Sequence, residues 1–200
     1  MSVQPQDILN VPGQIIGWFD DLGTGNEDHR FLSNFYEGDP FTVPGWTDPR
    51  TGEDAVWKTG EHAFAALKAW GEIDAQYCDI IDATDPAMAK ALGRSCRLRS
   101  DWEEVKLDVM AAIIRHKFTL DRVEGQKLIA TGTALLVEGT YWGDTVWGVS
   151  LQFSDDDVKE AEGRNWLGTL LQMRRAELIA EQLYGVTSQA GLYNAKFSVK

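Results

Sequence analysis

The feature that most constrains the fold of this sequence is a long helical pattern between Ser100 and Phe118. Ser100 and Glu103 have the spacing of a capping box, in which each side chain bonds the other residue's backbone at a helix start. Two apolar stripes follow at helical spacing: Trp102, Val105, Val109, Ala112 and Ile113, and Leu107, Met110, Ile114 and Phe118. Since a helix that is apolar on two sides must be covered on both, we expect this helix to be central.

A second helical pattern, residues 59–70, places two opposite charges on one face. Glu61, Ala65 and Lys68 follow each other at i, i+4 and i+7, and Gly71 marks the end of the helix. At a rise of 1.5 Å per residue the two charges lie about 10 Å apart along the axis, too far for an ion pair but near enough to reach one small molecule. The apolar neighbours Phe64 and Leu67 indicate partial burial, which shifts pKa values. Spacing alone favours a solvated surface helix, with a functional site as the alternative.

Shorter patterns predict a mixture of strands, helices and turns. The predicted strands are 14–20, 41–43, 54–57 and 134–138, with 38–57 as a hairpin whose connection, 46–53, projects into solvent. The remaining helices are 74–83, 86–93 (capped by Asp85 and Pro86 and stopped by Gly93), 121–132 and a long helix after 163–168. Residues 21–30 and the acidic stretch 154–162 are expected to be loops, and 31–36 a turn.

These elements predict an α+β fold: a single compact, helix-rich domain with a small β-sheet and a hairpin. A length of 200 residues suits one domain. We place an N-terminal arm at residues 1–13, the domain at 14–184 and a C-terminal tail at 185–200.

The charge balance is strongly acidic, with 31 Asp and Glu against 19 Lys and Arg and a formal net charge of −12. This argues against extended nucleic-acid binding through a broad basic surface, but it permits a small basic pocket. Arg94, Arg97 and Arg99 stand close together in the sequence and form either an anion site or a balance for acidic neighbours. Eight Trp residues serve the core or wall a ring-containing ligand.

Cysteine usage and the termini indicate a cytoplasmic protein. Cys78 and Cys96 lack the spacing of a zinc site or a disulfide framework, so we expect two free thiols and no metal. Neither a secretory signal nor an apolar run of ~20 residues is present in the sequence, so no membrane partner is expected.

Two further segments are candidate sites on local grounds. Asp144 follows the strand 134–138 and lies between Trp142 and Trp147, where it either projects into a cleft or caps its own turn. The helix start before Trp166 can offer unpaired N–H groups to a phosphate.

A series of motifs in this chain occurs, in the same order, in one protein family. They are Phe31-Leu32-Ser33-Asn34-Phe35 (family F-x-S-N-F), Gly60 to Lys68 (S-E-H-x-F-Q-A-x-K), Gly93-Arg94 (G-R), Trp102 to Lys106 (W-x-x-V-K), Tyr141-Trp142-Gly143-Asp144 (Y-W-G-D) and Gly163 to Gly168 (G-x-N-x-L-G). On these residues the chain resembles the NADAR family (NAD- and ADP-ribose-associated proteins) of the YbiA-like superfamily, from about residue 15 to 182.

The resemblance implies a YbiA-like fold and an N-glycosidase that cleaves a ribose from a base-like amine. Its expected reaction is removal of ADP-ribose from guanine. The alternatives are hydrolysis of phosphorylated riboflavin-pathway N-ribosides and a non-catalytic module that binds ADP-ribose or NAD derivatives. The implied partner is a small-molecule or nucleotide substrate carrying ADP-ribose or ribose phosphate, with no cofactor. An ADP-ribosyltransferase toxin as a protein partner stays open.

The resemblance also assigns roles to residues. Cleavage of an N-glycosidic bond develops positive charge at the ribose C1 while the leaving amine takes a proton, which suits the carboxylates of Glu61 and Asp144. Lys68 can form a Schiff base with the opened sugar if its amine is neutral. Trp102, the fourth catalytic candidate, and Trp142 can wall the ribose or stack on the base. The candidates for substrate binding are Ser33, Asn34, Phe35, His62, Arg94 (to phosphate), Lys106, Trp142, Gly143 and Asn165.

The chain departs from the family pattern near the proposed site. Gly60 replaces a Ser, Ala65 replaces a Gln and Trp166 stands at a position that is commonly basic or polar. We interpret Ala65 as the loss of a polar side chain beside Glu61, and expect these changes to affect substrate preference.

Overall fold

The computed structural model describes residues 15–17, 27–140, 142–154 and 157–185, and they divide into two compact units. Unit 1 combines the chain up to Ser33 with Leu120–Gly185, and unit 2 contains Asn34–Thr119. Each unit is described by itself. The predicted arm 1–13 and nearly all of the predicted tail 185–200 lie outside the described residues.

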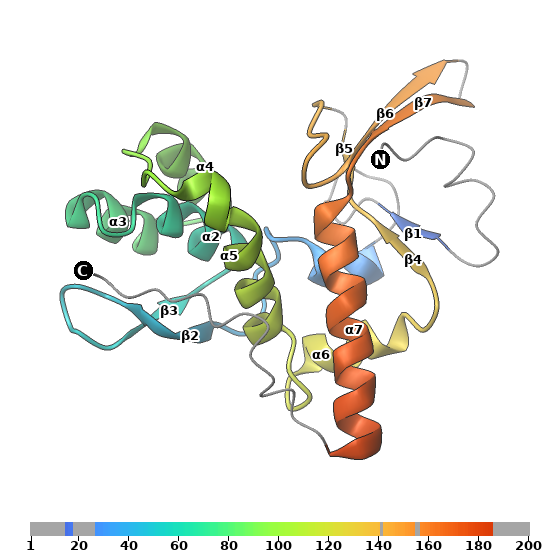
Figure 1. Ribbon diagram of the computed structural model, residues 1–200, viewed down its shortest axis with the longest axis horizontal. Helices are drawn as coiled ribbons and strands as arrows, with labels where there is room; N and C mark the ends of the chain where they lie inside the picture. The colour runs from blue at the N-terminus through green and yellow to red at the C-terminus, as the bar shows by residue number, and fades with distance from the viewer. Residues whose placement is uncertain (1–14, 18–26, 141, 155–156, 186–200) are drawn as a thin grey trace. The chain divides into compact units, whose positions relative to one another are not determined.

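Unit 2 begins with an antiparallel hairpin of β2 (Phe41–Thr47) and β3 (Asp54–Trp57) (Figure 1). Its inward-facing tryptophans belong to a cluster of aromatic rings. Trp46 meets Trp57 edge-on with ring centroids 6.2 Å apart, and Trp57 meets Tyr77 edge-on at 6.1 Å. Trp46 belongs to β2 and is buried, so the expectation that it projects into solvent is wrong.

Four helices complete unit 2: α2 (Gly60–Ala69), α3 (Asp74–Ile81), α4 (Pro86–Ser95) and α5 (Trp102–Lys117). Helix α2 packs against α3, α4, α5 and β3, and every residue of α2 except Lys68 is buried. The predicted surface helix is therefore the centre of unit 2. Helix α5 packs on α2 and β2 and has no highly exposed side chain after Glu104, as its two apolar stripes predict.

Two helix ends differ from the predictions because of contacts that the local sequence pattern does not show. Gly93 lies inside α4 because a Cβ there would come within 2.7 Å of the Ala65 Cβ, so this glycine serves a close approach of α4 to α2. Ser100 does not cap α5: the N-cap is Asp101, whose carboxylate bonds the Arg99 guanidinium with an Nε–Oδ1 distance of 2.5 Å.

Unit 1 contains short strands and two helices. Strand β1 (Ile15–Gly17) pairs in parallel with β4 (Leu135–Val137), and β5 (Gly139–Thr140) pairs in parallel with β6 (Val149–Ser154). Helix α7 (Trp166–Tyr184) packs on α6 (Val123–Ala130) and on β4 through its leucines (Figure 1). Helix α6 begins after Arg122 without a side-chain cap, two residues later than predicted.

Two predicted loops of unit 1 have regular structure. Residues Glu27–Leu32 form the 3₁₀ helix η1. Residues Asp157–Gly163 form strand β7, which pairs antiparallel with β6, so the acidic stretch is a hairpin strand. Strand pairing satisfies the backbone whatever the charge of the side chains, and composition does not reveal it.

Candidate functional site

Helix α2 starts at a close contact with the Ser33–Asn34 turn. The Thr59 hydroxyl caps the helix by accepting from the His62 N–H, and the Glu61 N–H donates to the Asn34 carbonyl over 2.9 Å. A Cβ at Gly60 would lie 2.7 Å from the Asn34 Oδ1, so glycine in place of the family's serine permits this approach. The contact fixes Asn34 beside Glu61.

Lys68 is the side chain by which the buried helix α2 reaches the unit's surface. Its Nζ lies 5.2 Å from the centroid of the Phe64 ring and 6.0 Å from that of the Trp102 ring, and the two rings are 5.0 Å apart. Within the described part of the chain this amine has no hydrogen-bond or ion-pair partner. Lys68 thus stands against an aromatic wall, where an ammonium loses hydration and gains cation–π attraction but no hydrogen bond.

The electrostatic surroundings of Lys68 favour its neutral form. Burial is the largest cause that lowers the Lys68 pKa, and the charges of Arg94 and Lys90 lower it further. The Glu61 carboxylate and the Cys96 thiol act in the opposite direction. A lysine with a lowered pKa holds more of the unprotonated amine that attacks a carbonyl or sugar carbon.

Glu61 shares the helix with Lys68 and is 7% exposed, so its carboxylate is largely removed from water. Glu61 and Lys68 lie seven positions apart on α2, as expected. The charge of Glu61 raises the Lys68 pKa through space. An amine and a carboxylate held on one rigid helix, beside the Phe64 and Trp102 rings, are suited to a nucleophile and a proton-transfer group acting on one substrate.

The three clustered arginines have different environments. Arg97 pairs with Glu72 at 2.9 Å, and Arg99 pairs with Asp101 and lies over the Trp70 ring. Arg94 is exposed and has no ion-pair partner among residues 27–140, 142–154 and 157–185. Charge balance is therefore shown for Arg97 and Arg99, while an anion site at Arg94 stays a prediction.

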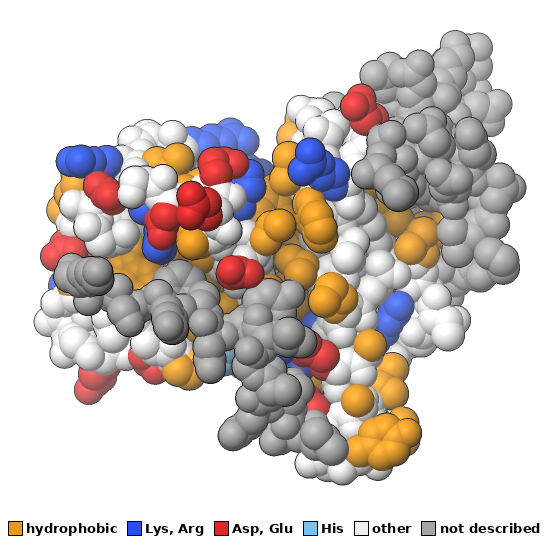
Figure 2. Space-filling model, viewed as in Figure 1, with side chains coloured by type: hydrophobic (Ala, Val, Ile, Leu, Met, Phe, Trp, Pro, Cys, Tyr) orange, Lys and Arg blue, Asp and Glu red, His pale blue; other side chains and the backbone are white. Residues whose placement is uncertain are grey.

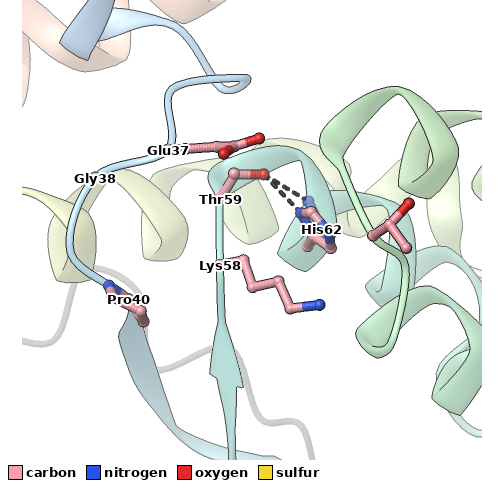
Figure 3. Close-up of a pocket in the computed structure, with 7 residues that line it drawn as sticks. Glu37, Gly38, Pro40, Lys58, Thr59 and His62 are labelled. Atoms are coloured by element: carbon pink, nitrogen blue, oxygen red, sulfur yellow. Dashed lines mark hydrogen bonds between the residues drawn. The ribbon is translucent and has the colours of Figure 1, made fainter.

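His62 lines a small pocket at the start of α2, together with Glu37, Gly38, Pro40, Lys58, Thr59 and Thr84 (Figure 3). The ring nitrogens of His62 lie 2.8 Å from the Thr59 hydroxyl and 3.2 Å from the Ala83 carbonyl, and burial lowers its pKa. The pocket volume of about 190 Å³ is below the about 300 Å³ at which ligand sites begin. A role of His62 in substrate binding stays a prediction, while its bonds show that it joins α2 to Ala83.

In unit 1, Trp142 to Asp144 form a short irregular segment that leads into a turn at residues 145–147. Gly143 has a φ of 81°, which favours glycine, and Trp142 is 52% exposed. The Asp144 Oδ1 accepts from the N–H groups of Val146 and Trp147 over 3.0 and 2.9 Å. The alternative in which Asp144 caps its own turn is thus realised, and any role in catalysis falls to its remaining oxygen. Tyr141 lies outside the described residues.

Asn165 joins α7 to the strands. Its Oδ1 accepts from the Glu138 N–H over 3.0 Å, and its Nδ2 donates to the Leu136 carbonyl over 2.8 Å. The backbone N–H groups of Trp166 and Leu167 donate to carbonyls at 146 and 147, so the expectation of unpaired N–H groups at this helix start is wrong for them. Substrate contact by Asn165 stays a prediction.

The remaining candidates have the following positions. Ser33 is buried, and the Asn34 amide lies 3.5 Å from the Met110 sulfur. Phe35 lies beneath the Lys90 ammonium, at 4.9 Å. Lys106 forms an ion pair with Glu103 one turn away. Unit 2 therefore holds Glu61, Lys68, Trp102, Arg94 and Phe35, and unit 1 holds the segment 142–144 and Asn165.

Sequence reasoning missed two features. Lys90 interacts electrostatically with Lys68. The feature of the sequence that could have revealed this residue is its position four residues before Arg94 on one helix. Ala65 is fully buried against Gly93, so this alanine is also a packing contact, and our interpretation of it as the loss of a polar side chain beside Glu61 stays a prediction.

Two absences can be stated for the described residues. No group of three or more His, Cys, Asp and Glu side chains there is arranged to hold a metal ion. None of the helices there has the length and apolar character to cross a membrane.

Comparisons with known proteins identify the family. A model of the NADAR domain matches residues 22–179. N-glycosidase YbiA of Escherichia coli (strain K12) is 34% identical over 186 residues, which are 91% of this chain and 100% of that protein. The solution NMR structure of E. coli YbiA superimposes with a TM-score of 0.63 at 33% identity, covering 92% of this chain and 96% of that one. A riboflavin biosynthesis protein of Vibrio vulnificus is 33% identical over 155 residues; this is 76% of the present chain but only 36% of that protein's length.

The chain belongs to the NADAR domain family. Within it, the chain has the helix-rich α+β fold with small sheets of the YbiA-like N-glycosidases, which are hydrolases acting on N-glycosyl compounds. The predicted family, fold class and enzyme class are confirmed.

Proposed function

We propose that this N-glycosidase removes ADP-ribose from guanine. The observation that carries the proposal is Lys68: an amine with a lowered pKa, set against the Phe64 and Trp102 rings and sharing a buried helix with Glu61. Membership of the NADAR family supports a small-molecule substrate that contains ADP-ribose or a related nucleotide.

The proposed reaction uses these groups in sequence. The glycosidic bond from the ribose C1 to the guanine nitrogen breaks, and Glu61 transfers a proton to the leaving nitrogen. The neutral Lys68 amine forms a bond to C1, and opening of the sugar ring gives a Schiff base. On ring opening the proton of the attached amine passes to the ring oxygen. Water then adds its OH to C1 and returns a proton to Glu61, the bond from C1 to the Lys68 nitrogen breaks, and ring closure returns the proton to the amine, so that one water is consumed and ADP-ribose and guanine are released. Asp144, just before the 145–147 turn of unit 1, is the second candidate carboxylate.

The aromatic wall supports a substrate with a flat ring system. Trp102 is buried with one face toward Phe64 and Lys68, and the half-exposed Trp142 can stack on a base. The net charge of −12 disfavours duplex DNA as the carrier of the modified guanine. A free nucleotide conjugate or an unpaired strand end is the favoured substrate.

A second candidate is hydrolysis of phosphorylated riboflavin-pathway N-ribosides. It is favoured by the similarity to the Vibrio vulnificus riboflavin biosynthesis protein over 76% of this chain. Both reactions break an N-ribosidic bond, so the same Glu61 and Lys68 serve either one. A non-catalytic module that binds ADP-ribose is the third candidate. Binding alone does not require the lowered pKa of Lys68, so this candidate is less favoured.

The test is a substrate panel with wild type, Glu61→Gln and Lys68→Ala. We expect wild type to release ADP-ribose from ADP-ribosylated guanosine faster than it hydrolyses phosphorylated riboflavin precursors, and both variants to lose activity. Borohydride should trap a protein–ribose adduct in wild type and not in Lys68→Ala. Equal release by all three proteins would show that the site is elsewhere. Tight ADP-ribose binding without turnover across the panel would identify a binding module.

A further inference from the structure

Helix α5 reaches the short segment 34–36 with two side chains of one face. Met110 and Lys117 are seven residues apart in α5, so a helical period of 3.6 places them on the same side of the helix, about 10 Å apart along its axis. The Asn34 amide nitrogen lies 3.5 Å from the Met110 sulfur. The Lys117 Nζ lies 5.7 Å from the centroid of the Tyr36 ring. The same face of α5 therefore holds both ends of the segment.

The segment 34–36 in turn contacts the start of α2, where the candidate carboxylate lies. The Asn34 carbonyl accepts from the Glu61 N–H over 2.9 Å, and the Asn34 Oδ1 would lie 2.7 Å from a Cβ at Gly60. The Glu61 side chain is largely buried on a helix that is packed on several sides. A displacement of the segment would therefore move the Asn34 side chain relative to a carboxylate that stays in place.

The Met110 sulfur determines which end of the Asn34 amide faces α2. A thioether sulfur accepts hydrogen bonds and donates none, so it selects the NH₂ end of the amide. The oxygen of the same amide then faces Gly60 at the start of α2. Met110 is 1% exposed, so the core of unit 2 holds the sulfur in place. A leucine at this position would fill nearly the same volume and leave the amide free to rotate.

Lys117 contacts the other end of the segment. Figure 2 shows Lys and Arg side chains of unit 2 gathered at its surface near α4, but Lys117 is only 4% exposed. Its Nζ lies 5.7 Å from the centroid of the Tyr36 ring and 5.0 Å from that of the Phe118 ring. Cation–π attraction is stronger when the ammonium is removed from water. Lys117 is not among the main causes of the Lys68 pKa shift, so its charge does not tune the candidate nucleophile.

We propose that Met110 and Lys117 are positioning residues of the N-glycosidase. They hold the segment 34–36 against α5 and keep the Asn34 amide in one orientation beside Glu61. An amide held in this way presents the substrate with one fixed arrangement of donor and acceptor, and such fixed geometry raises kcat. The inference rests on the proposed function only in taking Glu61 as the catalytic carboxylate, and it is the same for either N-riboside substrate.

The first test is a pair of double-mutant cycles, measured with whichever N-riboside of the substrate panel wild type cleaves. We expect Met110→Leu to lower kcat about 10-fold and to change KM less than about 2-fold, because a misplaced group loses its effect mainly in the transition state. In the Asn34→Ala background the same substitution should have no further effect, since Met110 acts through Asn34.

The second cycle combines Lys117→Met with Tyr36→Leu, and it separates the Tyr36 contact from the other contacts of Lys117. We expect the same loss in kcat, again without a further effect in the second background. Lys117→Arg should restore most of the kcat lost in Lys117→Met, because a guanidinium is also attracted to an aromatic ring.

The matched control is Ile113→Val, which shortens a fully buried apolar side chain of the same helix. It should lower stability in urea denaturation and leave kcat unchanged. Additive losses in the cycles, an unchanged kcat in Met110→Leu and Lys117→Met, or an equal loss of kcat in Ile113→Val would each overturn the positioning role. If Lys117→Met does not fold, the Met110 cycle and the amide measurement below decide the question.

The amide measurement needs no substrate. Nitrogen-15 NMR detects the protons of the Asn34 side-chain amide, which are assigned by their absence in Asn34→Ala. Their exchange with water should be at least about 5-fold faster in Met110→Leu than in wild type, because the amide loses its acceptor. Equal exchange in the two proteins would overturn the role of Met110. A wild type with the protected amide that cleaves no guanine conjugate would refute the proposed substrate and leave the positioning role standing.

Discussion

The two units use polar side chains in opposite ways. In unit 2, Lys68 is set against aromatic rings without a hydrogen-bond or ion-pair partner among the described residues. In unit 1, both polar atoms of Asn165 are bonded to the backbone of the β4 region, and one oxygen of Asp144 accepts two turn N–H groups. All of these residues belong to family motifs, yet their surroundings differ.

The difference distinguishes side chains suited to catalysis from side chains that stabilise the fold. A buried group whose bonds are complete is stabilised in one protonation state and fixes the backbone around it. A group that is desolvated without a partner has a shifted pKa and keeps its lone pair for a substrate. We therefore expect substitutions at Lys68 to act mainly on turnover and substitutions at Asn165 to act mainly on folding.

The largest expected effect follows replacement of Lys68. Lys68→Ala and Lys68→Arg should both lower kcat about 10³-fold or more, because arginine keeps the positive charge but does not supply a neutral amine. Stopped assays of ADP-ribose release would measure this. The control is Lys58→Ala: Lys58 donates to the Ala83 carbonyl over 2.8 Å, so its loss should reduce stability and spare kcat. Substantial activity in Lys68→Arg would contradict a covalent role.

The next effect is on folding. Asn165→Ala should lower the free energy of unfolding by about 3 kcal/mol, since it leaves the Leu136 carbonyl and the Glu138 N–H without their partners and puts alanine at a φ of 50°. Urea denaturation would measure the loss. Asn165→Gly tolerates the same φ and should recover about 1 kcal/mol of it. A loss below about 1 kcal/mol would show that these bonds are not structural.

Asp144 tests whether one residue serves both purposes. Asp144→Asn keeps the oxygen that accepts from Val146 and Trp147, so unfolding should change by less than about 0.5 kcal/mol. Loss of the carboxylate should nevertheless lower kcat about 10²-fold. Asp144→Ala should do the same and cost about 1 kcal/mol of stability as well. Full activity in Asp144→Asn would reduce Asp144 to a turn residue.

The smallest expected effect is a pH dependence from His62. Burial lowers the folded-state pKa of His62 below 6.5. Between that lowered pKa and pH 6.5, the unfolded chain therefore binds a proton that the folded chain does not bind. The contribution of His62 to stability should therefore fall as pH drops through this window and return as pH rises to 6.5. Denaturation curves at pH 5, 6 and 7 would compare wild type with His62→Gln, which should show a flatter dependence. Parallel dependences in the two proteins would refute the assignment.

Local signals in the sequence predicted much of unit 2 and less of unit 1. The caps at Thr59 and Asp85 are local bonds, so α2 and α4 begin where the sequence predicts. The partners of Asn165 lie 27 and 29 residues away, and no local pattern reveals them. The same limit applies to strand β7, whose pairing with β6 prevails over its acidic composition. At the site, the motif identified Glu61 and Lys68, but the burial of α2 and the place of Lys90 come from packing.

The contact between Ala65 and Gly93 also limits how the sequence can change over evolution. A side chain at position 93 would have to separate the helices α2 and α4, because its Cβ would lie 2.7 Å from the Ala65 Cβ, and the same movement would shift Lys90 and Arg94 relative to Lys68. A single substitution at Gly93 would thus alter helix packing and the charges around Lys68 together. Descendants of this sequence can accept a larger residue at position 93 only along paths in which a second mutation first loosens the helix contact.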